Sequence, residues 1–320
     1  MLEAALAAGI AIPHGCRSGF CGACKGKLIS GHTTPGIHAE NALSADDRAS
    51  GHALLCCVHA ASDLQLEVPG VVPPSEFPSR NFPARVRRLE RLSDDIMLIE
   101  LQLPAIDPIK FHAGQYIDIV LADGARRSFS IANAPHQESI IELHVRRIPD
   151  GRFTGEVFTT LKERDILNCE GALGTFWLRE DSTRPILMLA TGTGFAPLKG
   201  IIEHAIHAGI TRPITFYWGA RTPAGLYLDA LARRWADEIP DFRYVPVISG
   251  DAPDWNGRRG RIPETVLADI HDLSAYEVYA CGLPEMIKSA RKRLTTEGKL
   301  SVDAFYADAF TFSTPPSAKD

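Results

Sequence analysis

The sequence has few cysteines, no long hydrophobic run and no excess of basic residues. Seven cysteines in 320 residues are too sparse for a disulfide framework, and no signal peptide precedes them. The longest apolar stretches are far shorter than the roughly 20 residues that span a bilayer. Basic residues number 34 and acidic residues 39, for a net charge of −5, so no basic field suggests nucleic acid. We therefore expect a cytoplasmic protein that neither inserts into a membrane nor binds nucleic acid.

The remaining composition is that of a globular protein with two or three domains. Hydrophobic residues make up 45% of the chain and charged residues 23%, which are ordinary values for a soluble protein. A chain of 320 residues is too long for a single hydrophobic core. The sequence contains no internal repeat and no low-complexity segment.

Four of the cysteines have the spacing of a plant-type [2Fe–2S] cluster. HGCRSGFCGACKG follows C-x4-C-x2-C, and a fourth cysteine stands downstream in ALLCCVHA. Glycines let such a loop wrap tightly and turn backbone N–H groups toward the sulfurs of the cluster. A zinc site is the alternative, but zinc sites usually combine two C-x2-C knuckles, and only one is present. The candidate ligands are Cys16, Cys21, Cys24 and one of the adjacent Cys56 and Cys57, because neighbours in an extended segment point to opposite sides.

The first 82 residues predict a small domain and a linker. A short alanine-rich helix from Leu2 to Ala8 leads into the cysteine loop. Alternation in KGKLIS and DLQLEV predicts strands on either side of the segment with the fourth cysteine. We place the first domain at residues 1–69. The run PGVVPPSEFPSRNFP is rich in proline and has no periodic pattern, so residues 70–82 are predicted to be a stiff linker.

Two further domains follow. Residues 83–182 predict an antiparallel barrel from ARVRRLERL, DIMLIELQL, GQYIDIVLA, RRSFSIAN, SIIELHVRRI and DILNCEGALG, with one helix around 154–161. Residues 183–310 alternate strand and helix, which predicts a parallel sheet with ligands at the carboxyl ends of its strands. The strands are PILMLA, ITFYWG, RYVPVIS and YEVYACG, and helices are expected to begin near Ala196, Ala224, Pro263 and Pro284. Residues 311–320 read as a tail.

The order of the motifs resembles that of the ferredoxin–NADP reductase superfamily. PILMLA continues into TGTGFAPLKG, a glycine-rich turn that opens a helix and suits a pyrophosphate. This turn alone is weak evidence, because it does not match G-x-G-x-x-G. With RRSFSIAN upstream, YACGLPEMI downstream, FYADAF near the end and the cysteine module in front, the chain looks like the single-chain NADH-dependent ferredoxin reductases, which include reductase components of bacterial oxygenases. GHALLCC, GQYIDI, RRSFSIAN and YWGAR look most like the CDP-6-deoxyglucoseen reductases.

The resemblance implies a multidomain fold of α+β and α/β parts. These are a partial β-grasp ferredoxin domain, an antiparallel β-barrel flavin domain and a parallel-sheet α/β nucleotide domain. It also implies electron transfer from NADH through FAD and the [2Fe–2S] cluster to an acceptor protein, a dehydratase as in the CDP-6-deoxyglucoseen system. A reductase of an aromatic-ring dioxygenase or monooxygenase is the alternative. An electron-carrier module without flavin is the alternative of another class, and flavin absorption would exclude it.

The family's functional residues transfer to matching positions. Cys56 becomes the fourth cluster ligand, because it follows Leu54 and Leu55 as the ligand does in the family, and Cys57 becomes a small buried residue. Phe310 of FYADAF is expected to cover the flavin. The flavin-binding positions are Arg127 for the phosphates, Ser128, Phe129 against the flavin, Ser130 near N5, the strand His144, Val145 and Arg146, and Gly151 with Thr154 for the pyrophosphate. The nicotinamide-nucleotide positions are Gly192, Thr193, Gly194 and Pro197, with Cys281 and Gly282 beside the nicotinamide.

Two further expectations come from departures from the family pattern. Family cluster modules begin with a β-hairpin, whereas Met1 here starts at the first helix, so we expect a hairpin of roughly 25 residues to be missing. NADP-specific relatives place a Ser-Arg pair after the third strand of the nucleotide domain. Here Ser249 is followed by Gly250 and Asp251, so we expect NADH rather than NADPH. Arg221, which also follows a strand, is the counter-argument.

Overall fold

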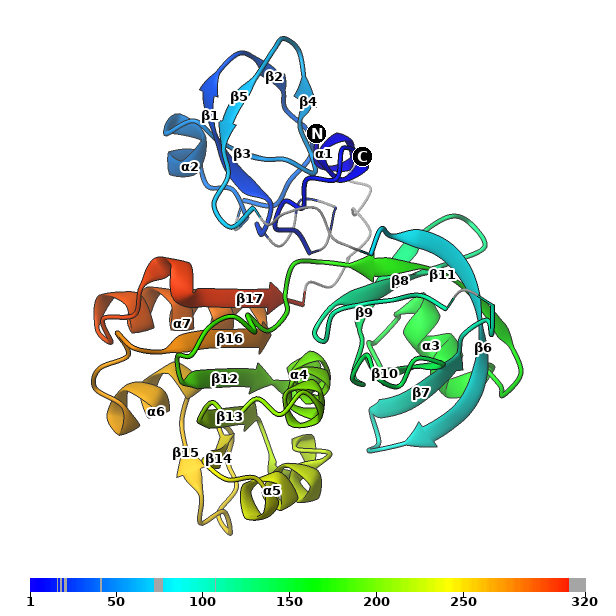
Figure 1. Cartoon of the computed structure of the whole chain (residues 1–320), viewed down its shortest axis with the longest axis vertical. Coiled ribbons are helices and arrows are strands. Elements are labelled where there is room, and N and C mark those ends of the chain that lie inside the picture. The colour runs from blue at the N-terminus through cyan, green and yellow to red at the C-terminus, as the bar shows by residue number, and fades with distance from the viewer. Residues whose placement is uncertain are drawn as a thin grey trace. The chain divides into compact units, whose positions relative to one another are not determined.

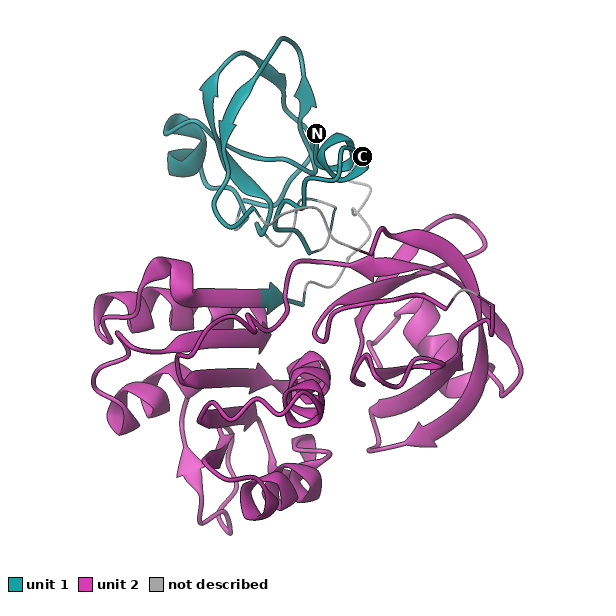
Figure 2. Cartoon of the chain, viewed as in Figure 1, with its two compact units in different colours: residues 1–76, 308–320 teal, residues 77–307 magenta. Residues whose placement is uncertain are grey.

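The computed structural model describes residues 1–15, 17, 19, 22–40, 42–71, 77–106 and 108–310. The chain forms two compact units, residues 1–76 with 308–320 and residues 77–307 (Figure 2). The predicted tail and part of the predicted linker lie outside the described residues. Among the described helices, none has the length and apolar character needed to cross a bilayer.

The first unit builds small antiparallel sheets around the segment that carries Cys56. β1 (Lys25–Ser30) pairs with β3 (His52–Leu54) on one side and with β5 (Gln65–Glu67) on the other. Two short strands, β2 (Thr33–Thr34) and β4 (His59–Ala60), form a second pair. The helices are α1 (Leu2–Ala7) and α2 (Ala45–Ala49). The predicted first helix and both predicted strands are therefore present.

The second unit begins with the predicted antiparallel barrel (Figure 1). Its strand order is β10-β7-β6-β11-β8-β9, and neighbouring strands pair antiparallel. A bridge between Ile131 and Leu143 joins the chain after β9 to β10. Its elements are β6 (Arg80–Arg91), β7 (Ile96–Gln102), β8 (Tyr116–Val120), β9 (Arg126–Ser130), β10 (Ile140–Arg146), α3 (Arg152–Thr159) and β11 (Ile166–Leu173). β6 begins inside the span predicted as linker.

The α/β part of this unit has the order β15-β14-β13-β12-β16-β17, with parallel pairing from β15 to β16. Its strands are β12 (Ile186–Thr191), β13 (Ile214–Ala220), β14 (Phe242–Ile248), β15 (Arg258–Arg259), β16 (Glu277–Gly282) and β17 (Phe305–Ala309). Its helices are α4 (Phe195–His207), α5 (Asp229–Glu238), α6 (Ile262–Asp269) and α7 (Pro284–Thr296), with 3-10 turns η1 (Gly192–Gly194), η2 (Pro223–Gly225) and η3 (Val302–Ala304).

One predicted helix start is wrong. The helix expected from Ala224 begins at Asp229, because the chain first makes the η2 turn and then leaves helical geometry at Leu226, where φ is −90° and ψ is 62°. The fold class itself is confirmed. β12 lies between β13 and β16, so chain connections diverge on its two sides. The loops that follow β12 and β16 therefore meet at a topological switch point, where open α/β sheets bind ligands.

Candidate cofactor site

Cys24 and Cys56 flank the pairing of β1 with β3. Lys25 pairs with Leu54, and the backbone N–H of Leu55 donates to the carbonyl of Cys24 at 3.0 Å. Cys24 is buried and Cys56 half-buried. Two thiols held on adjoining strand ends suit an iron–sulfur cluster. The other predicted ligands, Cys16 and Cys21, lie outside the described residues, and the residues that are described contain no group of three or more His, Cys, Asp or Glu that could hold a metal.

Our geometric expectation for the adjacent cysteines is wrong. Residues 55–57 form a turn, not an extended segment, and Cys57 N–H donates to Leu54 O at 2.9 Å. The two sulfurs consequently lie 3.4 Å apart, and Cys57 is half-buried rather than buried. A Cβ on Gly19 would lie 2.6 Å from Cys57 Sγ, so this side chain also borders the cysteine loop. The choice of Cys56 as ligand depends on the family resemblance and stays a prediction.

The predicted flavin motif forms β9. Phe129 packs against the barrel core, with its ring 5.4 Å from that of Phe153. Ser128 donates its hydroxyl to the buried carboxylate of Asp118 at 2.5 Å, which fixes its rotamer. Ser130 is 8% exposed, whereas Arg127 is half-exposed and donates to Arg126 O at 2.8 Å. A reachable guanidinium beside an aromatic ring and a buried serine fits a flavin nucleotide with anionic phosphates.

The loop before α3 is held by the residue predicted to bind the pyrophosphate. Thr154 Oγ1 accepts from Ile148 N–H at 3.2 Å and lies 3.3 Å from Gly151 O. A Cβ on Gly151 would lie 2.3 Å from the same hydroxyl. Thr154 thus secures the turn, and the N–H groups at the start of α3 are left as the anion-facing groups that a helix N-terminus offers. Its direct contact with a cofactor stays a prediction.

The turns after β12 and β16 interlock at the switch point. A Cβ on Gly194 would lie 2.2 Å from Cys281 O, and a Cβ on Gly282 would lie 2.3 Å from Thr191 Oγ1. Leu283 N–H donates to that threonine hydroxyl at 2.8 Å. Cys281 is fully buried, which suits a packing role rather than a nucleophile. The backbone crossing leaves room for no side chain at either glycine, and the contact of these turns with a nucleotide stays a prediction.

Strand β10 is the part of the barrel that contacts the glycine turn after β12. Arg146 reaches it directly, because a Cβ on Gly192 would lie 2.8 Å from Arg146 Nη1. Val145 faces the barrel core. His144 is buried between Glu142, 2.8 Å from Nε2, and the Tyr227 hydroxyl, 2.9 Å from Nδ1. Thr193 and Pro197 occupy the turn and the first turn of α4.

The predicted site residues and the residues that the structure brings together are not the same set. Phe310 follows β17 and is half-buried, and its role over the flavin stays a prediction. Sequence reasoning missed Glu142, Lys199 and Tyr227, which surround His144. Lysine inside the apolar run FAPLKGII was the one available signal, since a charged side chain in a buried helix requires partners.

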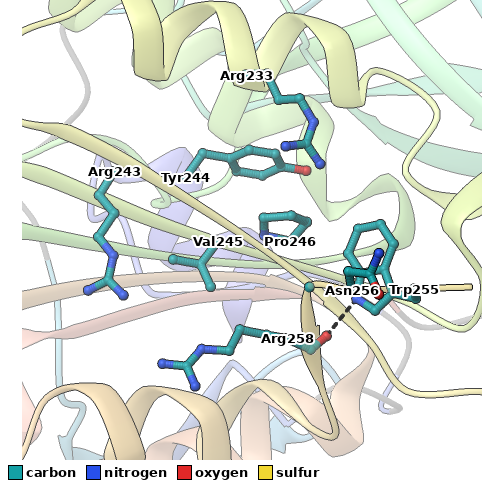
Figure 3. Close-up of a pocket in the computed structure, with 9 residues that line it drawn as sticks. Arg233, Arg243, Tyr244, Val245, Pro246, Trp255, Asn256 and Arg258 are labelled. Carbon is teal, nitrogen blue, oxygen red and sulfur yellow. Dashed lines mark hydrogen bonds between the residues drawn. The ribbon is translucent and has the colours of Figure 1, made fainter.

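A shallow cavity of about 480 Å³ lies beside β14, away from these residues (Figure 3). Two of its arginines, Arg243 and Arg258, pair with Asp269, and Arg233 pairs with Asp229. Its cations are thus already compensated, and no predicted site residue lines it. The lining residues are Arg233, Arg243, Tyr244, Val245, Pro246, Trp255, Asn256, Gly257 and Arg258.

Fold and site together define an oxidoreductase with flavin, nicotinamide and iron–sulfur modules. Three family models match: a 2Fe-2S iron-sulfur cluster binding domain at residues 1–61, an oxidoreductase FAD-binding domain at 83–177 and an oxidoreductase NAD-binding domain at 188–292. The chain belongs to the family of single-chain ferredoxin reductases that combine these three domains.

Relatives of known sequence cover almost the whole chain. The CDP-6-deoxy-L-threo-D-glycero-4-hexulose-3-dehydrase reductase of Yersinia pestis is 42% identical, over 97% of this chain and 92% of its own length. Reductase component 2 of terephthalate 1,2-dioxygenase from Comamonas sp. is 37% identical, over 97% and 91%. The crystal structure of an Amycolatopsis cytochrome P450 reductase has a TM-score of 0.83 and 33% identity, covering 98% of this chain and 94% of that one.

Proposed function

We propose that this protein takes electrons from NADH and delivers them to a partner dehydratase that acts on a CDP-linked deoxysugar. FAD supplies hydride acceptance and the cluster supplies one-electron transfer when they are bound. The observation that carries the proposal is one chain with a cysteine module, a barrel carrying the flavin motif and a sheet whose glycine turn contacts β10. A cytoplasmic location accords with cysteines that must stay reduced.

The residues of the chain bind and orient the cofactors, and none is required as a general acid, a general base or a nucleophile. Arg127 supplies a cation for the flavin phosphates, and the start of α3 supplies N–H donors. The interlocked turns at Gly194 and Gly282 hold the nicotinamide nucleotide. Cys24 and Cys56, with Cys16 and Cys21, are the proposed cluster ligands. Ser130, Cys281 and Phe310 are proposed to line the place where nicotinamide meets flavin.

The choice of partner rests on sequence similarity. A dehydrase reductase is 42% identical to this chain, against 37% for the terephthalate dioxygenase reductase component. A ring-oxygenase component is therefore the second candidate. The purified protein should show flavin and [2Fe–2S] absorption, and NADH should bleach both. Transfer to a purified CDP-hexulose dehydrase, but not to a ring-oxygenase terminal component, is the expected result. The reverse preference would overturn the partner assignment, and the absence of flavin would overturn the function.

The preference for NADH is proposed from the loops after β13 and β14. Asp251 is exposed on the second loop and would repel a 2′-phosphate. Arg221 is also exposed and lies against Gly250, whose N–H donates to Arg221 O at 2.9 Å. A Cβ on Gly250 would lie 2.5 Å from that carbonyl oxygen, so arginine at position 250 would disturb the loop. Position 251 is the better site for a test.

The test compares kcat/KM for NADH and NADPH in the wild type, Asp251→Asn and Asp254→Asn. Wild type should prefer NADH. Asp251→Asn should raise kcat/KM for NADPH by roughly threefold to tenfold, since one repulsive charge at the surface amounts to about 1 kcal/mol. Asp254→Asn removes an exposed acid three residues away and should have little effect. A wild type that favours NADPH would contradict the proposal.

A further inference from the structure

A buried lysine joins the nucleotide part of the second unit to its barrel. Lys199 lies on α4, five residues after Gly194, and is 7% exposed. Its ammonium group lies 3.2 Å from Glu142 Oε1 of β10 and 2.9 Å from Glu203 Oε1 one helical turn further along α4. It also donates to Ala132 O at 3.2 Å. Two of these three contacts are therefore to the barrel.

The barrel side of the contact continues through β10. Glu142 Oε1 accepts from His144 Nε2 at 2.8 Å, and His144 Nδ1 accepts from the Tyr227 hydroxyl at 2.9 Å. Burial lowers the pKa of His144 against the opposing effect of Glu142, and the carboxylate acceptor beside Nε2 assigns the ring proton to that nitrogen. Burial opposes ionisation of Glu142, but the hydrogen bond from His144 and the charge of Lys199 outweigh it and lower its pKa to about 2. Glu142 is thus an ionised acceptor shared by two elements.

The backbones also meet at this place. A Cβ on Gly200 would lie 2.9 Å from Asn133 O and 3.3 Å from Ile131 O. Those residues directly follow β9, the strand with the flavin motif. Helix α4 therefore touches the barrel both at the segment that follows β9 and at β10, the strand that reaches the nucleotide turn. An ammonium group between two such segments fixes their separation more strictly than apolar contact would.

One of the two carboxylates that contact Lys199 has an oxygen atom without a hydrogen bond. Glu203 Oε2 is buried with no hydrogen-bond partner among the described groups. Burial raises the pKa of Glu203, against the opposing effect of Lys199. Removing the lysine would leave two largely buried carboxylates near each other without a cation. Removing one partner of a buried ion pair costs more free energy than the intact pair contributes, so this arrangement of Glu142, Glu203 and Lys199 depends on the cation.

We propose that Lys199 is a positioning residue for hydride transfer: its ammonium group, held between Glu142 and Glu203, fixes the helix that begins at the nucleotide turn against the flavin-carrying strands. The proposal rests on the proposed transfer of hydride from NADH to FAD. It makes the distance between the two cofactor sites, rather than the affinity of either, the quantity that Lys199 sets. A misplacement of about 1 Å at a reacting centre can cost up to a hundredfold in rate.

The test uses the full chain, loaded with FAD and cluster, as wild type, Lys199→Met, Lys199→Arg and Arg212→Met. Arg212 forms a buried ion pair with Glu277 at 2.6 Å and donates to the carbonyl groups of Arg179 and Arg184, in the segment between β11 and β12. It therefore matches the loss of a buried cation without contacting β10 or residues 131–133. In Lys199→Met the limiting rate of flavin reduction should fall roughly ten- to hundredfold. The NADH concentration at half-maximal rate should change less than about threefold. The isotope effect from NADH deuterated at the transferred position should change as well.

Lys199→Arg should restore most of the rate, and Arg212→Met should leave the limiting rate and isotope effect as in the wild type. In the flavin-free protein, amides of residues 131–133 and 140–146 should exchange faster in Lys199→Met but not in Arg212→Met. Glu142→Gln replaces Lys199→Met if that variant does not fold. Unchanged rate and exchange in these variants would overturn the inference. If NADH does not reduce the flavin of the wild type, the proposed function is overturned instead. The exchange measurement would still test separately whether Lys199 fixes α4 against the barrel.

Discussion

Replacing Gly194 with alanine tests the crossing of the two turns that hold the nicotinamide nucleotide. The added Cβ would lie 2.2 Å from Cys281 O, 2.5 Å from Cys281 C and 2.9 Å from Gly282 N. All three are backbone atoms of the turn after β16, and none can rotate away. Restoring an ordinary contact of about 3.5 Å requires a relative movement of roughly 1 Å.

The expected effect follows from that movement. Overpacking of a close backbone contact costs about 1–3 kcal/mol of unfolding free energy. Because the turns at Gly194 and Cys281 are proposed to border the nicotinamide, a shift of this size should lower kcat/KM for NADH by roughly ten- to hundredfold. FAD and iron content should stay at wild-type levels, since the atoms that the added Cβ meets belong to the turn after β16 and not to the barrel or the first unit.

The assay is NADH-dependent reduction of ferricyanide, with FAD and iron measured in the same preparation. Gly155→Ala is the control: it lies inside α3 with nothing within 4 Å of the added Cβ. It should keep wild-type kcat/KM and gain about 0.5–1 kcal/mol of unfolding free energy. Wild-type kinetics in Gly194→Ala would refute the proposal that the crossing of these two turns positions the nicotinamide. Loss of FAD together with activity would indicate general misfolding instead.

Three other predictions concern separate parts of the chain. Cys56→Ser should abolish the [2Fe–2S] absorption and Cys57→Ser should largely spare it, with flavin reduction retained in both; the opposite pattern would reassign the ligand. Arg127→Ala should lower FAD retention after gel filtration, through the loss of one charge-assisted phosphate contact of about 1.5–3 kcal/mol, and undiminished retention would remove it from the site. Asp47→Asn should destabilise the first unit by about 1 kcal/mol in denaturant titration, because Asp47 accepts from Lys25 at 2.7 Å and completes the capping box with Ser44; equal stability would contradict that cap.

The strand pattern could be predicted because it depends on local alternation and composition. PILMLA is apolar throughout and ITFYWG is apolar except for Thr215, as expected for strands covered on both faces, and they form β12 and β13. The aromatic residues of FYADAF favour a role beside the flavin, whereas residues 305–309 also form the strand β17. The predicted start of α5 is too early. Pro223 suits the first turn of a helix, but here that turn is the 3-10 turn η2.

The side-chain network could not be predicted, because its members are far apart in sequence. Glu142 alternates with apolar residues in SIIELHVRRI and therefore looks like a solvent-facing position, yet its side chain is 14% exposed. Only the docking of α4 on β10 removes it from water. The turn at Cys56 and Cys57 is a similar case: the hydrogen bond from Cys57 N–H to Leu54 O depends on where β3 ends, not on any residue preference.

Helix α4 approaches backbone at two points within a short stretch of sequence. Gly194, just before the helix, meets the carbonyl of Cys281 on the sheet side, and Gly200 meets the carbonyl of Asn133 on the barrel side. Lys199, beside the second point, supplies the charge that pairs with the largely buried Glu142. The segment GFAPLKG therefore specifies more than a nucleotide turn. Small residues at the two crossings and a cation between them make the placement of the turn and the docking of the barrel properties of the same seven residues, so a change that moves one is expected to move the other.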